Sequence, residues 1–278
     1  MKLSEMKQVL AVRGIQLTKS LGQNFLHDGN QLRKIVDAGR LRSQDRVLEV
    51  GPGLGPLTEL LLAQAGSVLA VEKDERLVEV LRERFPNHPR LTLVAGDALE
   101  YTRRHREWAG WKAISNLPYS VASPILVELA LAAPGPDRIV ATLQLEVAER
   151  AAARAGEDAY GVFSLLLQLH YTPAPGFKIP ASCFHPMPEV DSGCLVLERR
   201  PRPLLAPDQT QTFVQLVKRA FSQRRKMMLK LLRQDWPAAR LEAGFASLGL
   251  APQTRAEEVS LEQFVRLAGA LTASSSAA

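Results

Sequence analysis

The sequence contains little that points to disulfide or metal chemistry. Its two cysteines, Cys183 and Cys194, are too few for a disulfide framework and lack the spacing of a zinc site. So few cysteines favour a reducing compartment, and we expect a cytoplasmic protein. The histidines are scattered and form no His-Glu-x-x-His motif: His27, His88, His105, His170 and His185. We therefore expect no metal site.

Long apolar segments are also missing. The richest one, residues 125–133, is interrupted by Glu128 and stopped by Pro134, so it is too short to span a membrane. Residues 1–13 are polar and charged and lack the apolar core of a signal peptide. We therefore expect no membrane partner. We find no internal repeat.

The sequence does have a surplus of positive charge and enough length for a sizeable core. It contains 35 Lys and Arg against 29 Asp and Glu, a formal net charge of +6, and its isoelectric point is near 9.5. This balance favours an anionic partner, with nucleic acid as the first candidate. A chain of 278 residues suits one large domain and one small one.

Strand and helix patterns alternate along the first 200 residues. Strand-like runs occur at 46–50, 68–71, 91–94, 112–115, 138–143, 171–173 and 193–197. Helical patterns occur at 4–13, 29–39, 56–64, 75–85, 121–132, 145–154 and 161–170. The alternation predicts an α/β fold, with a mostly parallel sheet and helices on both faces.

A proline-rich break at residues 201–207 separates this part from a purely helical pattern. Ser260 and Gln263 have the spacing of a capping box at the start of the last helix. We expect one domain at residues 1–200 and a second, all-helical domain at residues 201–278.

A glycine-rich loop, Gly51-Pro52-Gly53-Leu54-Gly55, follows the strand at 46–50 and opens a helix at Pro56. A nucleotide-binding loop requires this context. Glu72 ends the next strand, where a carboxylate can accept hydrogen bonds from both hydroxyls of a ribose. The GxGxG spacing favours S-adenosylmethionine over a nicotinamide dinucleotide.

Asp97 ends the third strand, in Gly96-Asp97-Ala98. Its carboxylate could accept from the adenine amine of a cofactor or could cap a helix, and the spacing leaves both interpretations open. The glycine loop, Glu72, Asp97 and Asn116 all follow the carboxyl ends of successive strands. Ligands of open α/β sheets bind at that edge, so we expect the site there.

The motif Asn116-Leu117-Pro118-Tyr119 ends the fourth strand. The Asn116 side-chain oxygen and the Leu117 carbonyl could hold both N–H groups of adenine's exocyclic amine, which would help to localise its lone pair. Pro118 fixes φ, and Tyr119 offers a ring on which a base can stack. The alternative is a strand-to-helix turn with a structural proline and tyrosine.

A second stiff segment runs from Phe184 to Ser192, with prolines at alternate positions. Phe184 could bring a second ring against a target base. The alternative is a surface loop with a packed phenylalanine.

A basic stripe occupies residues 218–233, which contain seven Lys or Arg and no acid. Its centre is Arg224-Arg225-Lys226. Such a stripe predicts salt-dependent contacts with phosphates. A solvated helix face is the alternative.

Six sequence elements, which occur in the order given below, resemble those of the rRNA adenine N6,N6-dimethyltransferases over residues 20–235. The elements are Gly22-Gln23-Asn24-Phe25-Leu26, Glu49-Val50-Gly51-Pro52-Gly53-Leu54-Gly55, Glu72, Gly96-Asp97-Ala98, the Asn-Leu-Pro-Tyr motif, and the Phe184–Ser192 segment. Each motif alone is weak, but the combination is specific. The sequence is most similar to the 16S rRNA branch, associated with kasugamycin sensitivity.

The resemblance implies a Rossmann-like methyltransferase domain with a seven-stranded sheet, which uses S-adenosylmethionine, and a helical C-terminal RNA-binding domain. It implies cofactor contacts at Gln23, Asn24, Leu26, Gly51, Gly53, Glu72, Lys73, Asp97, Ala98 and Asn116. It places the target adenine at Asn116, Leu117, Pro118, Tyr119 and Phe184, and RNA at Arg224, Arg225 and Lys226. The implied substrate is a pair of adjacent adenines in the 3′-terminal hairpin loop of 16S rRNA, within the 30S subunit or its precursor. We expect a monomer.

Two rival functions remain at this stage. A resistance-type enzyme that methylates one adenine of 23S rRNA shares most of these motifs. A non-catalytic assembly factor on the same fold would bind a ribosomal precursor without chemistry, although the complete cofactor constellation argues against it. A nicotinamide dehydrogenase is disfavoured, because the Asn-Leu-Pro-Tyr motif has no role in hydride transfer.

Overall fold

The computed structural model describes residues 1–16, 23–223 and 225–272, and it divides the chain into two compact units. The first unit comprises Met1–Ala148 and Thr172–Arg199, and the second comprises Glu149–Tyr171 and Arg200–Ala278. The sequence placed a single boundary at residue 200. The structure instead groups residues 149–171 with the C-terminal helices, and the buried Tyr160 hydroxyl donates a hydrogen bond of 3.0 Å to the Val259 carbonyl.

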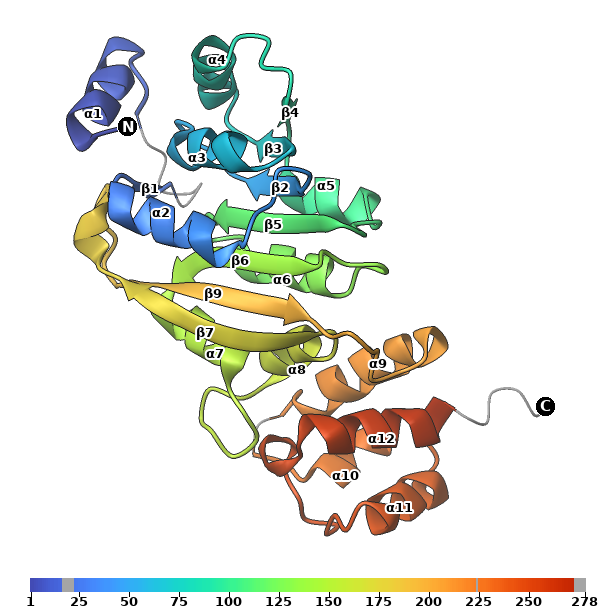
Figure 1. Cartoon of the computed structure of the whole chain (residues 1–278). Helices are drawn as coiled ribbons and strands as arrows, with labels where there is room; N and C mark the ends of the chain where they lie inside the picture. Colours follow the sequence, from blue (N-terminus) through green and yellow to red (C-terminus); the bar gives the residue numbers. More distant parts are fainter. Residues whose placement is uncertain (17–22, 224, 273–278) are drawn as a thin grey trace. The chain divides into compact units, whose positions relative to one another are not determined.

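The first unit is built on a seven-stranded sheet with the strand order β4-β3-β2-β5-β6-β9-β7 (Figure 1). The four pairings that join the strands β4, β3, β2, β5 and β6 are parallel, and β9 runs antiparallel to β6. The strands are β2 Arg46–Val50, β3 Ser67–Glu72, β4 Leu91–Ala95, β5 Trp111–Asn116, β6 Arg138–Gln144, β7 Tyr171–Ile179 and β9 Ser192–Arg199. This confirms the predicted mostly parallel α/β fold.

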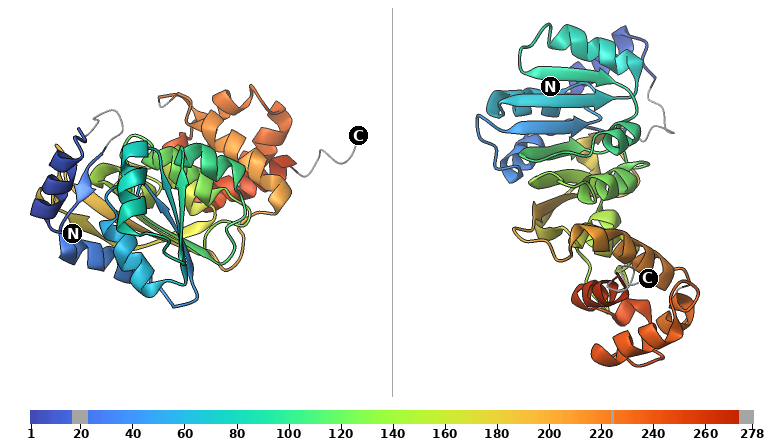
Figure 2. Two further views of the ribbon diagram at one scale, coloured as in Figure 1. Left: turned by 90° about the horizontal axis from the view of Figure 1, so that it is seen from above. Right: turned by 90° about the vertical axis from the view of Figure 1, so that its right-hand side faces the viewer.

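Helices cover both faces of this sheet. The helices α2 and α3 pack together on one face, and α5 and α6 pack together on the other (Figures 1 and 2). Apolar residues of the strands fill the core between the layers, since β2 and β6 are buried along almost their whole length. The helices are α1 Leu3–Val12, α2 Gly29–Ala38, α3 Pro56–Gln64, α4 Glu75–Arg84, α5 Ala98–Arg104, α6 Ala122–Ala130 and α7 Leu145–Ala152.

Three elements differ from the sequence prediction. The strand β7 continues to Ile179, beyond the predicted end at residue 173, because its two prolines are tolerated on an edge strand. The helix α5 was not predicted, although Asp97 was recognised as a possible cap. Residues 25–26 and 184–185 are not among the predicted strands, and they form the antiparallel strands β1 Phe25–Leu26 and β8 Phe184–His185.

The second unit contains the C-terminal helices around an apolar core that includes Phe213, Phe245 and Phe264. Ser260 and Gln263 form the predicted capping box, with reciprocal hydrogen bonds of 2.9 and 3.2 Å between each backbone N–H and the other side chain. The helices of this unit are α8 Val162–Gln168, η3 Pro207–Gln209, α9 Thr210–Ala220, α10 Met228–Leu232, α11 Ala238–Ser247, η4 Ala256–Glu258 and α12 Leu261–Thr272. One further short helix, η2 Ala181–Cys183, belongs to the first unit.

Among the described residues, no helix is both long and apolar enough to span a membrane. The same residues contain no group of His, Cys, Asp or Glu side chains that could hold a metal ion.

Candidate functional site

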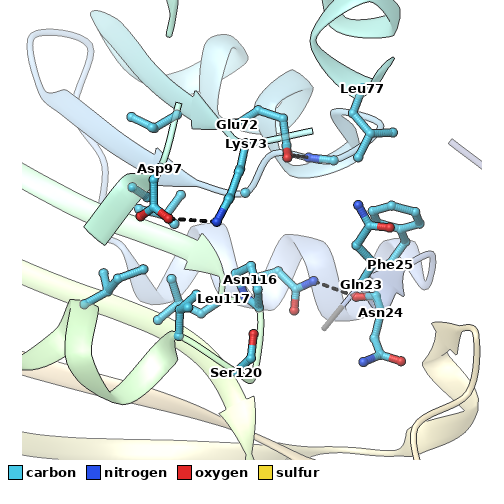
Figure 3. A pocket seen from close by; sticks show the side chains of 18 of the residues that line it. Gln23, Asn24, Phe25, Glu72, Lys73, Leu77, Asp97, Asn116, Leu117 and Ser120 are labelled. Atoms are coloured by element: carbon cyan, nitrogen blue, oxygen red, sulfur yellow. Dashed lines mark hydrogen bonds and ion pairs between the residues drawn. The ribbon is translucent and has the colours of Figure 1, made fainter. Parts of the chain in front are cut away.

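A cleft opens at the carboxyl ends of β2, β3, β4 and β5, the edge at which the sequence placed a ligand (Figure 3). All the predicted cofactor residues except Leu26 line it. The lining also includes residues that were not among the predicted site residues: Phe25, Val50 and Gly96, which stand within the quoted motifs, and Val71, Leu77, Ser120, Val121 and Ile125. Gly22, part of the motif that suggested the family, lies outside the described residues.

The glycine loop and Glu72 form one wall of the cleft (Figure 3). One Glu72 carboxylate oxygen accepts from the Gly53 N–H at 3.0 Å, and the other accepts from the Asp74 N–H, also at 3.0 Å. Burial raises the pKa of Glu72, while these backbone hydrogen bonds oppose the rise. Glu72 therefore fixes the loop as well as facing the ligand space.

Gly53 cannot be replaced by a larger residue without a clash. Its φ is +61°, and a Cβ atom there would lie 2.6 Å from the Phe25 ring. Phe25 in turn packs with Met6 and Leu10 of α1 in a small apolar cluster. The N-terminal helix thus supports the loop through a ring that the sequence analysis did not single out.

Asp97 takes the capping role that the sequence left open. Its Oδ1 accepts from the Leu99 and Glu100 N–H groups at the start of α5, at 2.8 and 3.3 Å. Its Oδ2 pairs with Lys73 Nζ at 2.9 Å (Figure 3), and this ion pair lowers the pKa of Asp97. A bound adenine amine would have to share Oδ2 with Lys73, whose side chain is largely exposed.

The Asn116 amide is held from two sides. Its Nδ2 donates to the Asn24 carbonyl at 3.0 Å (Figure 3), and its Oδ1 accepts from the hydroxyl of the fully buried Thr142. Thr142 lies directly opposite Asn116 in the pairing of β5 and β6. These contacts fix which end of the amide is the acceptor and leave Oδ1 with a second lone pair for a ligand N–H.

We expect Thr142→Val to lower the rate of methyl transfer about tenfold, the effect of losing one orienting hydrogen bond. Thr142→Ser keeps the hydroxyl and should restore most of the rate. Thr102→Val is a matched control, because the hydrogen bonds of the buried Thr102 hydroxyl within the described residues go to carbonyls of its own helix. Single-turnover kinetics would measure the three rates, and equal rates for Thr142→Val and wild type would contradict the positioning role.

The rest of the Asn-Leu-Pro-Tyr motif is only partly directed into the cleft. Leu117 and Pro118 line it, whereas Tyr119 does not. The Tyr119 hydroxyl lies 2.6 Å from the Ser192 hydroxyl at the start of β9. Burial raises the pKa of Tyr119. This contact ties the motif to the end of the Phe184–Ser192 segment.

Phe184 and Leu26 lie in the core rather than in the cleft. They are paired across β1 and β8, are only 3% and 2% exposed, and belong to the same apolar cluster. The alternative interpretation of Phe184 as a packed ring therefore describes its position here. A base could stack on Phe184 only after the ring left this cluster.

Of the predicted RNA-binding residues, Arg224 lies outside the described residues. Arg225 and Lys226 are exposed on the turn between α9 and α10, and neither makes an ion pair with a described residue. Two other residues of the basic stripe form ion pairs with acids of the same unit. Arg219 pairs with Asp235 at 2.5 Å, and Arg233 pairs with Glu242 at 2.7 Å.

Comparisons with known proteins agree with this geometry. The sequence model of the family described as ribosomal RNA adenine dimethylase matches residues 14–273. A ribosomal RNA small subunit methyltransferase A from Latilactobacillus sakei is 38% identical over 95% of this chain and 93% of its own length. The protein of the same name from Geobacter metallireducens is 39% identical over 94% of this chain and 97% of its own.

Solved structures show the same fold. The 23S rRNA methyltransferase ErmE aligns with a TM-score of 0.68 and 29% identity, covering 89% of this chain and 99% of its own. A dimethyladenosine transferase from Plasmodium falciparum aligns with a TM-score of 0.74 and 24% identity, covering 87% and 95%. The chain belongs to the ribosomal RNA adenine dimethylase family.

Proposed function

We propose that this enzyme dimethylates N6 of two adjacent adenines in the 3′-terminal hairpin loop of 16S rRNA. The substrate would be the small ribosomal subunit or its precursor in the cytoplasm, and the enzyme would act as a monomer. The observation that carries the chemistry is the oriented Asn116 amide at the edge of the cleft. The substrate is supported by the small-subunit methyltransferases that are 38% and 39% identical over nearly the whole chain.

S-adenosylmethionine, the methyl donor of this family, supplies a methyl group that its sulfonium already activates. The cleft suits an adenosine, because carboxylates at the ends of β3 and β4 stand beside apolar walls that include Leu77 and Ile125. Glu72 would accept hydrogen bonds from the ribose hydroxyls of the donor, and Asp97 would accept one from its adenine amine. The backbone at Gly51 and Gly53 would let the rest of the donor molecule approach closely.

The protein's main task is then to position the target amine. Asn116 Oδ1 and the Leu117 carbonyl would accept its two N–H groups and direct its lone pair at the methyl group, which is catalysis by orientation. Held in this way, the amine nitrogen would take the methyl group from the sulfonium, leaving a neutral thioether, and would then release a proton to solvent. The acids lining the cleft, Glu72 and Asp97, are both engaged as hydrogen-bond acceptors within the protein, so we assign no general base.

The second unit would hold the RNA by its phosphates. We expect Arg225→Gln with Lys226→Gln to weaken RNA binding and to reduce the slope of log affinity against log salt by about two, since each lost phosphate contact contributes about one. Arg233→Gln is the control, because Glu242 already neutralises that charge. Filter binding across a salt series would measure both, and an unchanged slope in the double variant would show that the turn faces solvent only.

The test of the proposed function is transfer from labelled S-adenosylmethionine to unmethylated small subunits and, in parallel, to 23S rRNA. Paired dimethyladenines in 16S rRNA are the expected product. Label confined to 23S rRNA would place the chain with ErmE-like enzymes, whose lower identity of 29% argues against that outcome. Tight subunit binding without any label would favour an assembly factor.

A further inference from the structure

The segment between β8 and β9, residues 186–191, is anchored at both ends beside the cleft. At its start, β8 pairs with β1, whose Phe25 lines the cleft. At its end, the Ser192 hydroxyl contacts the Tyr119 hydroxyl at 2.6 Å, and the Asp191 carbonyl accepts from the Leu145 N–H at 3.0 Å. We call residues 186–191 the proline loop.

The proline loop exposes apolar side chains to solvent. Met187 is 69% exposed and Val190 is 48% exposed, while Phe184 just before the loop is buried and anchors it. Pro186 and Pro188 flank Met187, and a residue before proline is restricted to extended conformations. The methionine is therefore presented on a stiff support, which lowers the entropy that binding would cost.

A lysine, Lys7, lies near the base of the proline loop. Lys7 and His27 lie near His185 in β8, and burial together with these two groups lowers its pKa. Of the two acids in the loop, Asp191 is neutralised by Lys178 at 2.7 Å, which leaves Glu189 as the exposed acid. The apolar tip could contact bases, and Lys7 near its base could contact the phosphate backbone of the same nucleic acid.

A target adenine must leave its stack before its amine can reach Asn116. Proteins that bind the minor groove of DNA insert apolar side chains, methionine among them, between base steps and partially unstack them. We propose that Met187 is this wedge, entering the rRNA beside the target adenine and filling the space that the adenine vacates. This inference rests on the proposed RNA substrate. It makes Met187 a positioning residue that contacts RNA bases, a contact that the Phe184 ring cannot make while it is buried as in this structure.

The test compares Met187→Ser with Met187→Leu and with Val12→Ser in the full-length protein. Val12 is a matched control, because it is the most exposed large apolar residue among the described residues of the same unit, at 77%, and lies on α1. Single-turnover methyl transfer to unmethylated small subunits should fall about tenfold in Met187→Ser. It should stay near wild type in Met187→Leu and Val12→Ser. Binding of S-adenosylhomocysteine should be the same in all four proteins.

A direct readout uses a hairpin RNA with 2-aminopurine beside the target adenine. Its fluorescence should rise when wild type or Met187→Leu binds and should rise less with Met187→Ser. Equal transfer rates or equal fluorescence for Met187→Ser and wild type would overturn the wedge, as would an equal loss in Met187→Leu. If wild type methylated only 23S rRNA, the proposed substrate would be wrong, while the ratio of the Met187→Ser and wild-type rates on that RNA would still decide the role of Met187.

Discussion

Asn116→Ala should lower the rate of methyl transfer about a thousandfold, comparable to the loss of a key electrostatic contact in other active sites. The substitution removes the Oδ1 acceptor that Thr142 and Asn24 hold in place. An adenine amine without that acceptor keeps its lone pair conjugated with the ring and is poorly aligned with the methyl group. The rate should be measured under single-turnover conditions with saturating donor.

The fold and the donor site should survive Asn116→Ala, because the glycine loop, Glu72 and Asp97 keep their own hydrogen bonds. Affinity for S-adenosylhomocysteine, measured by calorimetry, should change less than about tenfold. Asn30→Ala, at an exposed position in α2, is the control for loss of an asparagine side chain. Turnover close to wild type in Asn116→Ala would refute the role assigned to the amide.

Much of the cleft could be predicted from the sequence because its members sit at strand ends. Gly53, Glu72, Asp97 and Asn116 follow four strands that are far apart in the chain. A parallel sheet brings all their carboxyl ends to one edge, whatever the details of packing. Local patterns therefore sufficed to group these residues, and all four line the same cleft.

Thr142 and Phe25 could not be found in this way. Thr142 lies inside an apolar strand, and only the register of β6 against β5 brings its hydroxyl to Asn116. Phe25 acts through its packing on Gly53 and α1, which depends on tertiary contacts. Thr142 belongs to no motif, and although Phe25 stands in the Gly22–Leu26 motif, nothing in that motif indicates that its ring packs on Gly53.

The position of Phe184 also depended on long-range pairing. Strands of two residues are too short to show a period, so the pairing of β1 with β8 left no sequence signal. That pairing places the Phe184 ring in the core. In the Phe184–Ser192 segment the most exposed large apolar side chain is Met187 rather than Phe184.

Glu72→Gln should lower the affinity for S-adenosylhomocysteine about a hundredfold, although the two side chains have nearly the same shape. Both carboxylate oxygens of Glu72 accept from backbone N–H groups, those of Gly53 and Asp74. Glutamine has only one acceptor oxygen, so its NH₂ group would face one of these donors in a buried site. The glycine loop would lose a contact, and the ribose hydroxyls would lose an ionised acceptor.

The pH dependence gives an independent check on the same carboxylate. Because burial raises the pKa of Glu72, lowering the pH should neutralise it before an ordinary exposed glutamate. The ionised form is the one that accepts hydrogen bonds, so affinity should fall as the pH falls through this raised pKa. Glu72→Gln should lack that phase, whereas Glu79→Gln, in an exposed pair with Arg82, should retain it. Calorimetric titrations that gave Glu72→Gln a wild-type affinity and pH profile would remove Glu72 from the donor site.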